Sequence, residues 1–230
     1  MSSSKNIQQL IAEQTDYFRV GVSVDCVIFG FGDNELKVLL IKSDLEEFRD
    51  QWSLLGDLVR PDENLDSASY RILKARTGLE DVYLQQVYSF GALNRHPAGR
   101  VITIAYYSLV NIRDHDLKVD ANHLHWHPVK ELNTMAFDHK SILDTCIRRL
   151  RDMVIDHPVV FNLLPKKFSL RELQCLYECI LDQKLDRRNF RKRFFQKDWL
   201  IDTGEMEEEV PHRPGKLYMF NKTRFPCNAQ

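Results

Sequence analysis

The sequence predicts an α+β protein in two parts, an N-terminal α/β/α sandwich with a mixed sheet and a C-terminal winged helix-turn-helix. Strand-like runs separated by turns, with amphipathic helices among them, fill residues 1–157. After Pro158 the order becomes strand, helix, turn, helix, strand, loop, strand, which is typical of a winged helix. Residues 158–230 also carry 14 Lys and Arg against 10 Asp and Glu, whereas the whole chain carries 32 against 33. We therefore predict two domains, 1–157 and 158–230.

The composition, with 43% hydrophobic and 28% charged residues, indicates an ordinary globular protein. The start lacks the basic and apolar regions of a signal peptide, and no apolar run approaches the length of a membrane span. We expect a cytoplasmic protein with no membrane partner. The five cysteines have no ligand-like spacing with histidines, so we expect reduced, small apolar residues.

Hydrophobic periodicity assigns the N-terminal elements in order. Residues 2–18 predict a helix. Strands are predicted where β-branched and aromatic residues lie between turn residues, over residues 21–31, 36–41, 52–55, 83–92, 100–112 and 123–127. The strand at 100–112 alternates poorly, so we expect burial on both of its faces. Helices are predicted at 64–77 and within 135–157, because apolar residues recur there at spacings of three and four. The buried stripe expected for the first of these helices is Leu65, Ala68, Ile72 and Ala75.

Residues 56–79 carry a loop–helix motif. A Gly-containing loop leads into the helix, which ends at Gly78. The segment resembles the Nudix box, usually written G-x5-E-x7-R-E-U-x-E-E-x-G-U with U aliphatic. Anchored on Gly78, the matching positions are Glu63, Arg71, Leu73 and Leu79, with Asp57 on the opening glycine position and Gly56 just before it. Glu63 and Arg71 are suited to an ion pair that pins the loop to the helix.

The motif lacks the glutamates that do the chemistry in Nudix hydrolases. Their positions hold Ile72, Ala75 and Arg76. Magnesium requires oxygen ligands, and a positive charge about 4 Å away costs about 4 kcal/mol per unit charge at an effective dielectric near 20. We expect the helix to turn Ile72 and Ala75 toward apolar packing. We therefore predict a Nudix-shaped domain that is not an enzyme and holds no metal or cofactor.

Three histidines alternate with apolar residues at His123, His125 and His127, which places them on one face of a strand. This geometry resembles part of a zinc site. No Asp, Cys or further His lies nearby in sequence to complete the ligand set, so we favour a solvent-facing row.

The C-terminal part begins with a strand predicted at 159–163. Ser169 and Glu172 form a capping box that opens the first helix of the helix-turn-helix. Asp186 is the predicted N-cap of the second helix, residues 187–197. Strands at 199–202 and 216–220 then enclose a polar loop, which forms the wing.

The second helix places basic and amide side chains opposite its apolar face. Arg and Lys suit guanine in the major groove, whereas Asn and Gln suit adenine. The predicted groove-facing residues are Arg188, Asn189, Arg191, Lys192 and Gln196. The predicted phosphate contacts are Arg187 and Arg193 on the helix and Arg213 and Lys216 in the wing. The acidic residues 207–209 in the same loop argue against DNA contact by the wing tip.

The whole chain resembles the Nudix-related transcriptional regulators, which join a Nudix-like sensor to a winged helix. In the C-terminal part the resemblance lies in residues 164–165, 169–174, 177–178, 185–191 and 212–215. It implies a ligand-responsive regulator, a repressor, that binds double-stranded operator DNA as a homodimer. One branch of this family regulates NAD metabolism and senses ADP-ribose-type ligands; another regulates arabinose utilisation. This chain looks more like the second, which implies L-arabinose as effector and sugar catabolism as the process, with ADP-ribose sensing as the alternative.

We expect the effector in the former substrate cleft, bordered by the loop at 44–52, the start of the motif and the loop at 93–99. The predicted ligand-binding residues are Phe48, Trp52, Asp57, Glu63, Asn94, Arg95 and His96. A neutral sugar requires only hydrogen-bonding side chains and a stacking aromatic.

Two other classes of function stay open. One is a residual Nudix hydrolase with a displaced metal site that uses Glu63 and Asp57, Asp62 or Asp66. The other is a protein-interaction adaptor whose basic helix binds an acidic partner.

Overall fold

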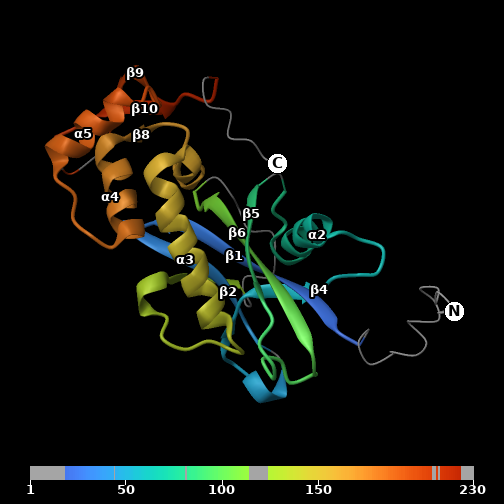
Figure 1. Cartoon of the computed structure of the whole chain (residues 1–230). Coiled ribbons are helices and arrows are strands. Elements are labelled where there is room, and N and C mark those ends of the chain that lie inside the picture. Colours follow the sequence, from blue (N-terminus) through green and yellow to red (C-terminus); the bar gives the residue numbers. More distant parts are fainter. Residues whose placement is uncertain are drawn as a thin grey trace, which may run out of the picture.

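A computed structural model describes residues 19–43, 45–80, 82–113, 124–208, 211 and 213–223 of the chain (Figure 1). The helix expected at residues 2–18 and the side chain of His123 lie outside these residues. Within the described ranges, no helix is both long enough and apolar enough to cross a membrane.

The N-terminal part contains a mixed sheet, as predicted. Seven strands of the described residues form it, in the order β3-β2-β1-β6-β5, with β4 paired to β1 and β7 paired to β2. β1 and β6 are parallel, and the other pairs are antiparallel. The bounds are β1 Gly21–Gly32, β2 Glu35–Lys42, β3 Trp52–Ser53, β4 Leu55–Leu58, β5 Tyr83–Phe90, β6 Val101–Asn111 and β7 Leu124–Pro128. The central strand β6 is buried along nearly its whole length, which confirms burial on both faces.

Two helices cover the two faces of this sheet, α2 (Leu65–Thr77) and α3 (His139–Asp156). Side chains of β1 alternate between them, because successive residues of a strand point to opposite faces. Cys26 and Ile28 pack in the cluster that includes Ile72 of α2, whereas Val27 and Phe29 pack in the cluster of α3. Figure 1 shows α2 and α3 on opposite sides of the strands, which is the predicted α/β/α sandwich.

Helix α3 begins at His139, four residues after the start of its predicted range. Residues 135–138 are not helical, and Phe137 has a positive φ of 52°, which a helix cannot contain. Short 3-10 turns, η2 (Glu46–Phe48) and η3 (Val129–Glu131), lie in the connecting loops.

The C-terminal part is a winged helix. Helices α4 (Leu170–Leu181) and α5 (Arg187–Gln196) are followed by β9 (Leu200–Met206) and β10 (Lys216–Phe220). Both predicted N-caps are confirmed, since the Ser169 side chain accepts from the Glu172 N–H and the Asp186 side chain accepts from the Asn189 N–H. A short strand that sequence reasoning missed, β8 (Phe168–Ser169), completes a three-stranded sheet in the order β8-β10-β9.

The strand predicted at 159–163 is wrong. Residues Pro158–Leu163 form a 3-10 turn, η4, with Val160, Phe161 and Leu163 buried. A short apolar run does not distinguish a strand from a tight helical turn. These side chains belong to one continuous hydrophobic cluster that extends from Val27 in the sheet to Phe220 in the winged helix. The two parts of the chain therefore share an interior.

Candidate functional site

Arg71 clamps the loop that precedes α2. Its guanidinium donates to both carboxylate oxygens of Glu63 at 2.7–3.2 Å, to Asp57 Oδ2 at 2.9 Å and to the Leu58 carbonyl at 2.9 Å. Glu63 also accepts from the Arg60 N–H at 2.8 Å. The hydrogen bonds from Arg71, followed by that from Arg60, lower the pKa of Glu63 to about 2. Asp57 and Glu63, both predicted to bind ligand, are thus held by Arg71; for Glu63 this is the ion pair that the sequence also suggested.

Gly56 of β4 cannot carry a side chain, because Asp25 lies too close to it. A Cβ on Gly56 would collide with the carboxylate of Asp25 on the neighbouring strand β1. Asp25 is buried, and burial raises its pKa, because an apolar environment disfavours the charged form. Gly56 therefore makes room for a buried acid that sequence reasoning missed.

The positions of the missing glutamates differ in burial. Ile72 is 1% exposed, as expected, but Ala75 is exposed, so the prediction that Ala75 packs inward is wrong. Arg76 is exposed as well. The buried face of α2 is made of Ala68, Ser69, Ile72, Leu73 and Thr77. In the described part of the chain, no group of three or more His, Cys, Asp or Glu side chains is arranged to hold a metal ion.

His125 and His127 pack against Trp52. Their ring centroids lie 5.2 and 4.1 Å from that of Trp52, and Lys42 Nζ lies 5.4 Å from the same ring. The three rings therefore form an aromatic cluster with tilted and edge-on contacts. Trp52, predicted to bind ligand, is engaged in that cluster.

The loop between β5 and β6 inserts Arg95 into the sandwich. Arg95 Nε donates to Asp138 Oδ2 at 2.8 Å and Nη2 donates to Asp138 Oδ1 at 2.6 Å, while Nη1 donates to the Thr103 hydroxyl at 2.5 Å. Only 4% of the Arg95 side chain is exposed. Asn94 lies exposed beside it with a φ of 57°.

His139, the first residue of α3, faces Asp25. Its Nδ1 accepts from the Leu54 N–H at 3.0 Å, and Nε2 lies 3.7 Å from Asp25 Oδ2. Burial lowers the pKa of His139, because desolvation disfavours the imidazolium. The start of α3 therefore carries two polar side chains, Asp138 and His139, that meet groups from β1 and from the β5–β6 loop.

An aromatic cluster stands next to this polar network. Phe137 lies at its centre, with ring centroids 4.2 Å from Phe48, 5.1 Å from His96 and 4.9 Å from His139. The His96 ring is stacked on Phe137 at 15°. A positive φ on a bulky residue stores strain, and such strain is concentrated at functional sites. The structure thus brings Phe48, Arg95 and His96 together.

We call this cluster of side chains the candidate cleft, because Phe48, Arg95 and His96 come from the two loops predicted to border the effector cleft. Its members are Asp25, Phe48, Arg95, His96, Phe137, Asp138 and His139. Sequence reasoning missed Asp25, Phe137, Asp138 and His139. The available signal was the run of Phe, Asp and His directly before the apolar periodicity of α3.

The second helix of the winged helix exposes the predicted basic face. Arg187, Arg188, Asn189, Arg191, Lys192 and Gln196 are all exposed. A groove of about 1060 Å³ lies between this helix and the wing, and its lining includes Arg171, Arg187, Arg191, Arg213 and Lys216. Lys216 also pairs with Asp202 at 2.8 Å.

Two acidic side chains of the wing are engaged within the protein. Glu207 Oε2 accepts from the Gly215 N–H at 2.8 Å, and Glu205 pairs with Lys167 at 2.7 Å. Among residues 207–209, whose charge the sequence suggested would repel phosphate, Glu207 is engaged, Glu208 is exposed, and Glu209 lies outside the described residues.

Arg193, a predicted phosphate contact, is exposed and bonds to the end of α3. Its Nη2 donates to the Ile155 carbonyl at 3.0 Å, and Lys197 Nζ donates to the same carbonyl at 2.8 Å. Arg193 therefore lies on the side of α5 that faces α3, apart from the other basic residues of the predicted set.

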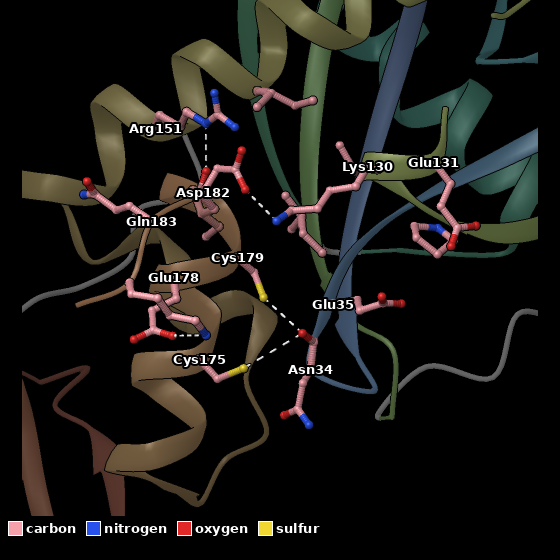
Figure 2. Close-up of a pocket in the computed structure, with 16 residues that line it drawn as sticks. Asn34, Glu35, Lys130, Glu131, Arg151, Cys175, Glu178, Cys179, Asp182 and Gln183 are labelled. Carbon is pink, nitrogen blue, oxygen red and sulfur yellow. Dashed lines mark hydrogen bonds and ion pairs between the residues drawn. The ribbon is translucent and has the colours of Figure 1, made fainter. Parts of the chain in front are cut away.

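A cavity of about 530 Å³ lies between the sheet domain and α4 (Figure 2). Lys130 pairs with Asp182 across it, and Arg151 Nε donates to the Ile180 carbonyl at 2.8 Å. The thiols of Cys175 and Cys179 approach the Asn34 carbonyl at 3.9 and 3.0 Å, respectively. Figure 2 shows these side chains bridging the two walls.

Comparison with known proteins identifies both parts. Residues 19–149 match the NUDIX domain model, and residues 160–220 match the model of the NrtR DNA-binding winged helix domain. The "ADPR responsive transcriptional repressor NtrR" of Acinetobacter baylyi is 30% identical over 90% of this chain and 85% of its own length. An ADP-ribose pyrophosphatase of Methanocaldococcus jannaschii is 28% identical over 57% of this chain and 76% of its own length.

A solved structure extends the similarity to the whole architecture. The crystal structure of Shewanella oneidensis NrtR complexed with a 27mer DNA superposes with a TM-score of 0.78 at 30% identity, covering 86% of this chain and 93% of that one. Three observations agree. The chain has a Nudix sandwich whose helix α2 lacks the motif glutamates, and a winged helix with an exposed basic face. A relative matches both parts. The chain belongs to the NrtR-type family of transcriptional repressors, in which a NUDIX domain is followed by an NrtR DNA-binding winged helix domain.

Proposed function

We propose that this protein is a DNA-binding repressor that responds to ADP-ribose and regulates NAD metabolism, with the effector bound in the candidate cleft. The expectation of L-arabinose finds no support in the comparisons, since the full-length relative is named as responsive to ADPR.

The observation that carries the proposal is the aromatic cluster beside a guanidinium. Phe48, His96 and Phe137 offer ring faces suited to a purine, and base–aromatic stacking contributes about 1–3 kcal/mol per base. A pentose alone has no aromatic ring to fill such a cluster.

The absence of the motif glutamates from α2 supports the same effector. In an enzyme its carboxylates bind a diphosphate through a metal ion, and without the metal they would repel the diphosphate. Ile72, Ala75 and Arg76 remove three negative charges and add one positive charge. A diphosphate ligand without a metal is therefore better tolerated here than in a hydrolase.

The proposed DNA reader is α5. A homodimer would present two copies of α5 to successive major grooves, about 34–36 Å apart. Arg188 and Lys192 are proposed to contact bases in the major groove of DNA. Arg187, Arg191 and Arg213 line the protein groove between α5 and the wing, and they are the proposed phosphate contacts. A protein-interaction adaptor would not require two copies of α5 at the distance between successive major grooves.

Calorimetric titration of the full chain tests the effector. We expect ADP-ribose to bind and L-arabinose to give no heat. Phe137→Ala is expected to weaken ADP-ribose at least tenfold, whereas Phe195→Ala, an exposed aromatic on α5, leaves its affinity unchanged. Binding of arabinose but not ADP-ribose would refute the proposed effector.

A duplex selected by the protein from a random library tests the DNA reader. Arg188→Ala with Lys192→Ala should abolish binding to that duplex at fixed salt and leave ADP-ribose affinity intact. Retained DNA affinity would refute the assignment of α5.

A further inference from the structure

The C-terminal end of α3 is bonded directly to the helix-turn-helix. The Val154 carbonyl accepts from the Tyr177 hydroxyl of α4 at 3.1 Å, and the Ile155 carbonyl accepts from both Arg193 and Lys197. The last carbonyls of a helix lack partners within the helix and carry partial negative charge, so cations are favoured there. Two basic side chains from the end of α5 supply that charge.

Lys197 is held in place on more than one side. Its Nζ lies 4.1 Å from the centroid of the Trp199 ring, while Trp199 is 5% exposed. Burial and the neighbouring Arg193 lower the pKa of Lys197. A lysine that contacts DNA phosphate would instead extend into water, so this position is suited to a contact within the protein.

The opposite end of α3 forms part of the candidate cleft. Asp138 is the N-cap residue, and its carboxylate binds Arg95 instead of the helix N–H groups. His139 follows it and faces Asp25. Helix α3 thus joins the candidate cleft to the end of α5. It has 18 residues and is about 27 Å long at 1.5 Å per residue.

The body of α3 is packed in a way that transmits a displacement. Its inward face is buried in the cluster that both parts of the chain share, and the residues of that face are Ile142, Leu143, Cys146, Ile147, Leu150 and Val154. Close-packed interiors are stiff, so a shift at the start of α3 is carried along it instead of being absorbed. Figure 1 shows α3 running from the sheet domain to the side of α4.

From these contacts we infer that Arg193 and Lys197 are positioning residues, which fix the DNA-reading helix to α3 and thereby connect it to the effector cleft, and are not phosphate contacts. This inference rests on the proposed function for its effector and its DNA. It separates α5 into two flanks: Arg187 and Arg191 line the groove beside the wing, whereas Arg193 and Lys197 hold α3.

The salt dependence of DNA binding distinguishes the two roles. The slope of log K against log salt is negative, and each phosphate contact that is lost reduces its magnitude by about 0.9. The full chain carrying Arg193→Ala and Lys197→Ala should keep the wild-type slope on the selected duplex. The comparison variant, Arg187→Ala with Arg191→Ala, removes two proposed phosphate contacts and should reduce the magnitude of the slope by about 1.8 on the same duplex. A comparable loss in the Arg193 and Lys197 variant would overturn the inference.

The effector response is the second readout. Allosteric coupling typically changes affinity 5- to 150-fold. We expect ADP-ribose to weaken DNA binding of the wild type within that range, and of the double alanine variant by less than twofold. The conservative pair Arg193→Lys and Lys197→Arg keeps both donors and should restore the response. A full response in the alanine variant would overturn the inference.

Amide hydrogen exchange tests the attachment without DNA or effector. In the alanine variant, residues 190–197 should exchange about tenfold faster than in the wild type, whereas Arg188→Ala with Lys192→Ala should leave them unchanged. Unchanged exchange in the first variant would refute the attachment. If the wild type binds DNA but ignores ADP-ribose, the proposed effector fails, and the slope and exchange measurements still decide the role of Arg193 and Lys197.

Discussion

Arg95 and Asp138 form a two-point ion pair across 43 residues of sequence, with Nε–Oδ2 and Nη2–Oδ1 distances of 2.8 and 2.6 Å. The pair joins the β5–β6 loop to the first turn of α3, and the Arg95 side chain is almost fully buried. Removing one partner of such a pair leaves a charge uncompensated in a poorly hydrated place.

Arg95→Ala should therefore lower the free energy of unfolding by about 2 kcal/mol, less than for a fully buried pair because Asp138 keeps some solvent contact. Urea unfolding followed by circular dichroism measures this change. The matched control is Arg100→Ala in the same loop, since Arg100 is exposed and donates only to the carbonyls of Gly91 and Ala92. Equal losses in both variants would contradict the importance of the ion pair.

The Arg71–Glu63 clamp should resist acid. Because the folded-state pKa of Glu63, about 2, lies below its ordinary value of 4.5, its contribution to stability is present above pH 4.5 and is lost as the pH falls toward 2. We expect the carboxyl ¹³C shift of Glu63 to stay at its ionised value at pH 3. A midpoint for Glu63 near 4.5 would show that the clamp does not form.

Hydrolysis of ADP-ribose should be undetectable with Mg²⁺ or Mn²⁺. Three of the four acids named for a displaced metal site are engaged: Asp57 and Glu63 bind Arg71, and Asp66 accepts from the Tyr106 hydroxyl at 2.8 Å. Chromatographic detection of AMP measures turnover, with a metal-free incubation as control. Sustained metal-dependent release of AMP would contradict a purely regulatory role.

Restoring the motif glutamates should be opposed by packing at one position. Ala75→Glu with Arg76→Glu changes two exposed residues and should alter stability by less than about 1 kcal/mol. Adding Ile72→Glu places a carboxylate where the side chain is 1% exposed and should cost about 3 kcal/mol more. Thermal unfolding distinguishes them; equal melting temperatures would show that α2 can rotate to expose residue 72.

The two half-buried thiols on α4 should react slowly. Burial raises the pKa of Cys179 to about 11 and also raises the pKa of Cys175, and only the thiolate is nucleophilic. Alkylation of Cys179 by iodoacetamide should accelerate nearly tenfold per pH unit between pH 7.5 and 9.5, as measured by peptide mass spectrometry. Rapid labelling that is flat over this range would mean a lowered pKa.

The elements predicted correctly are those whose signals are local. The caps at Ser169 and Asp186 depend on residues within one turn, and the strands β1 and β6 follow from composition. The 3-10 turn η4 was predicted as a strand because a short, largely apolar run fits both structures. The domain boundary at 157/158 stays a prediction.

The site was harder to predict because its contacts are long-range. Phe48, Arg95 and His96 were selected from loops, but their partners Phe137 and Asp138 come from a segment read as helix. The Leu54–His139 hydrogen bond spans 85 residues, and no periodicity signals such a contact. Arg193 was predicted to contact phosphate from its position on a helical wheel. A wheel gives the direction of a side chain but does not show its bond to the Ile155 carbonyl.

The interior shared from Val27 to Phe220 has an evolutionary consequence. Exchanging the sensor for one from another protein would strip apolar side chains such as Val160 and Leu163 of their neighbours, so whole-domain recombination is penalised. New effectors are then more readily acquired by substitution in the loops around Phe137. Such a lineage would change what it senses gradually while keeping the same junction.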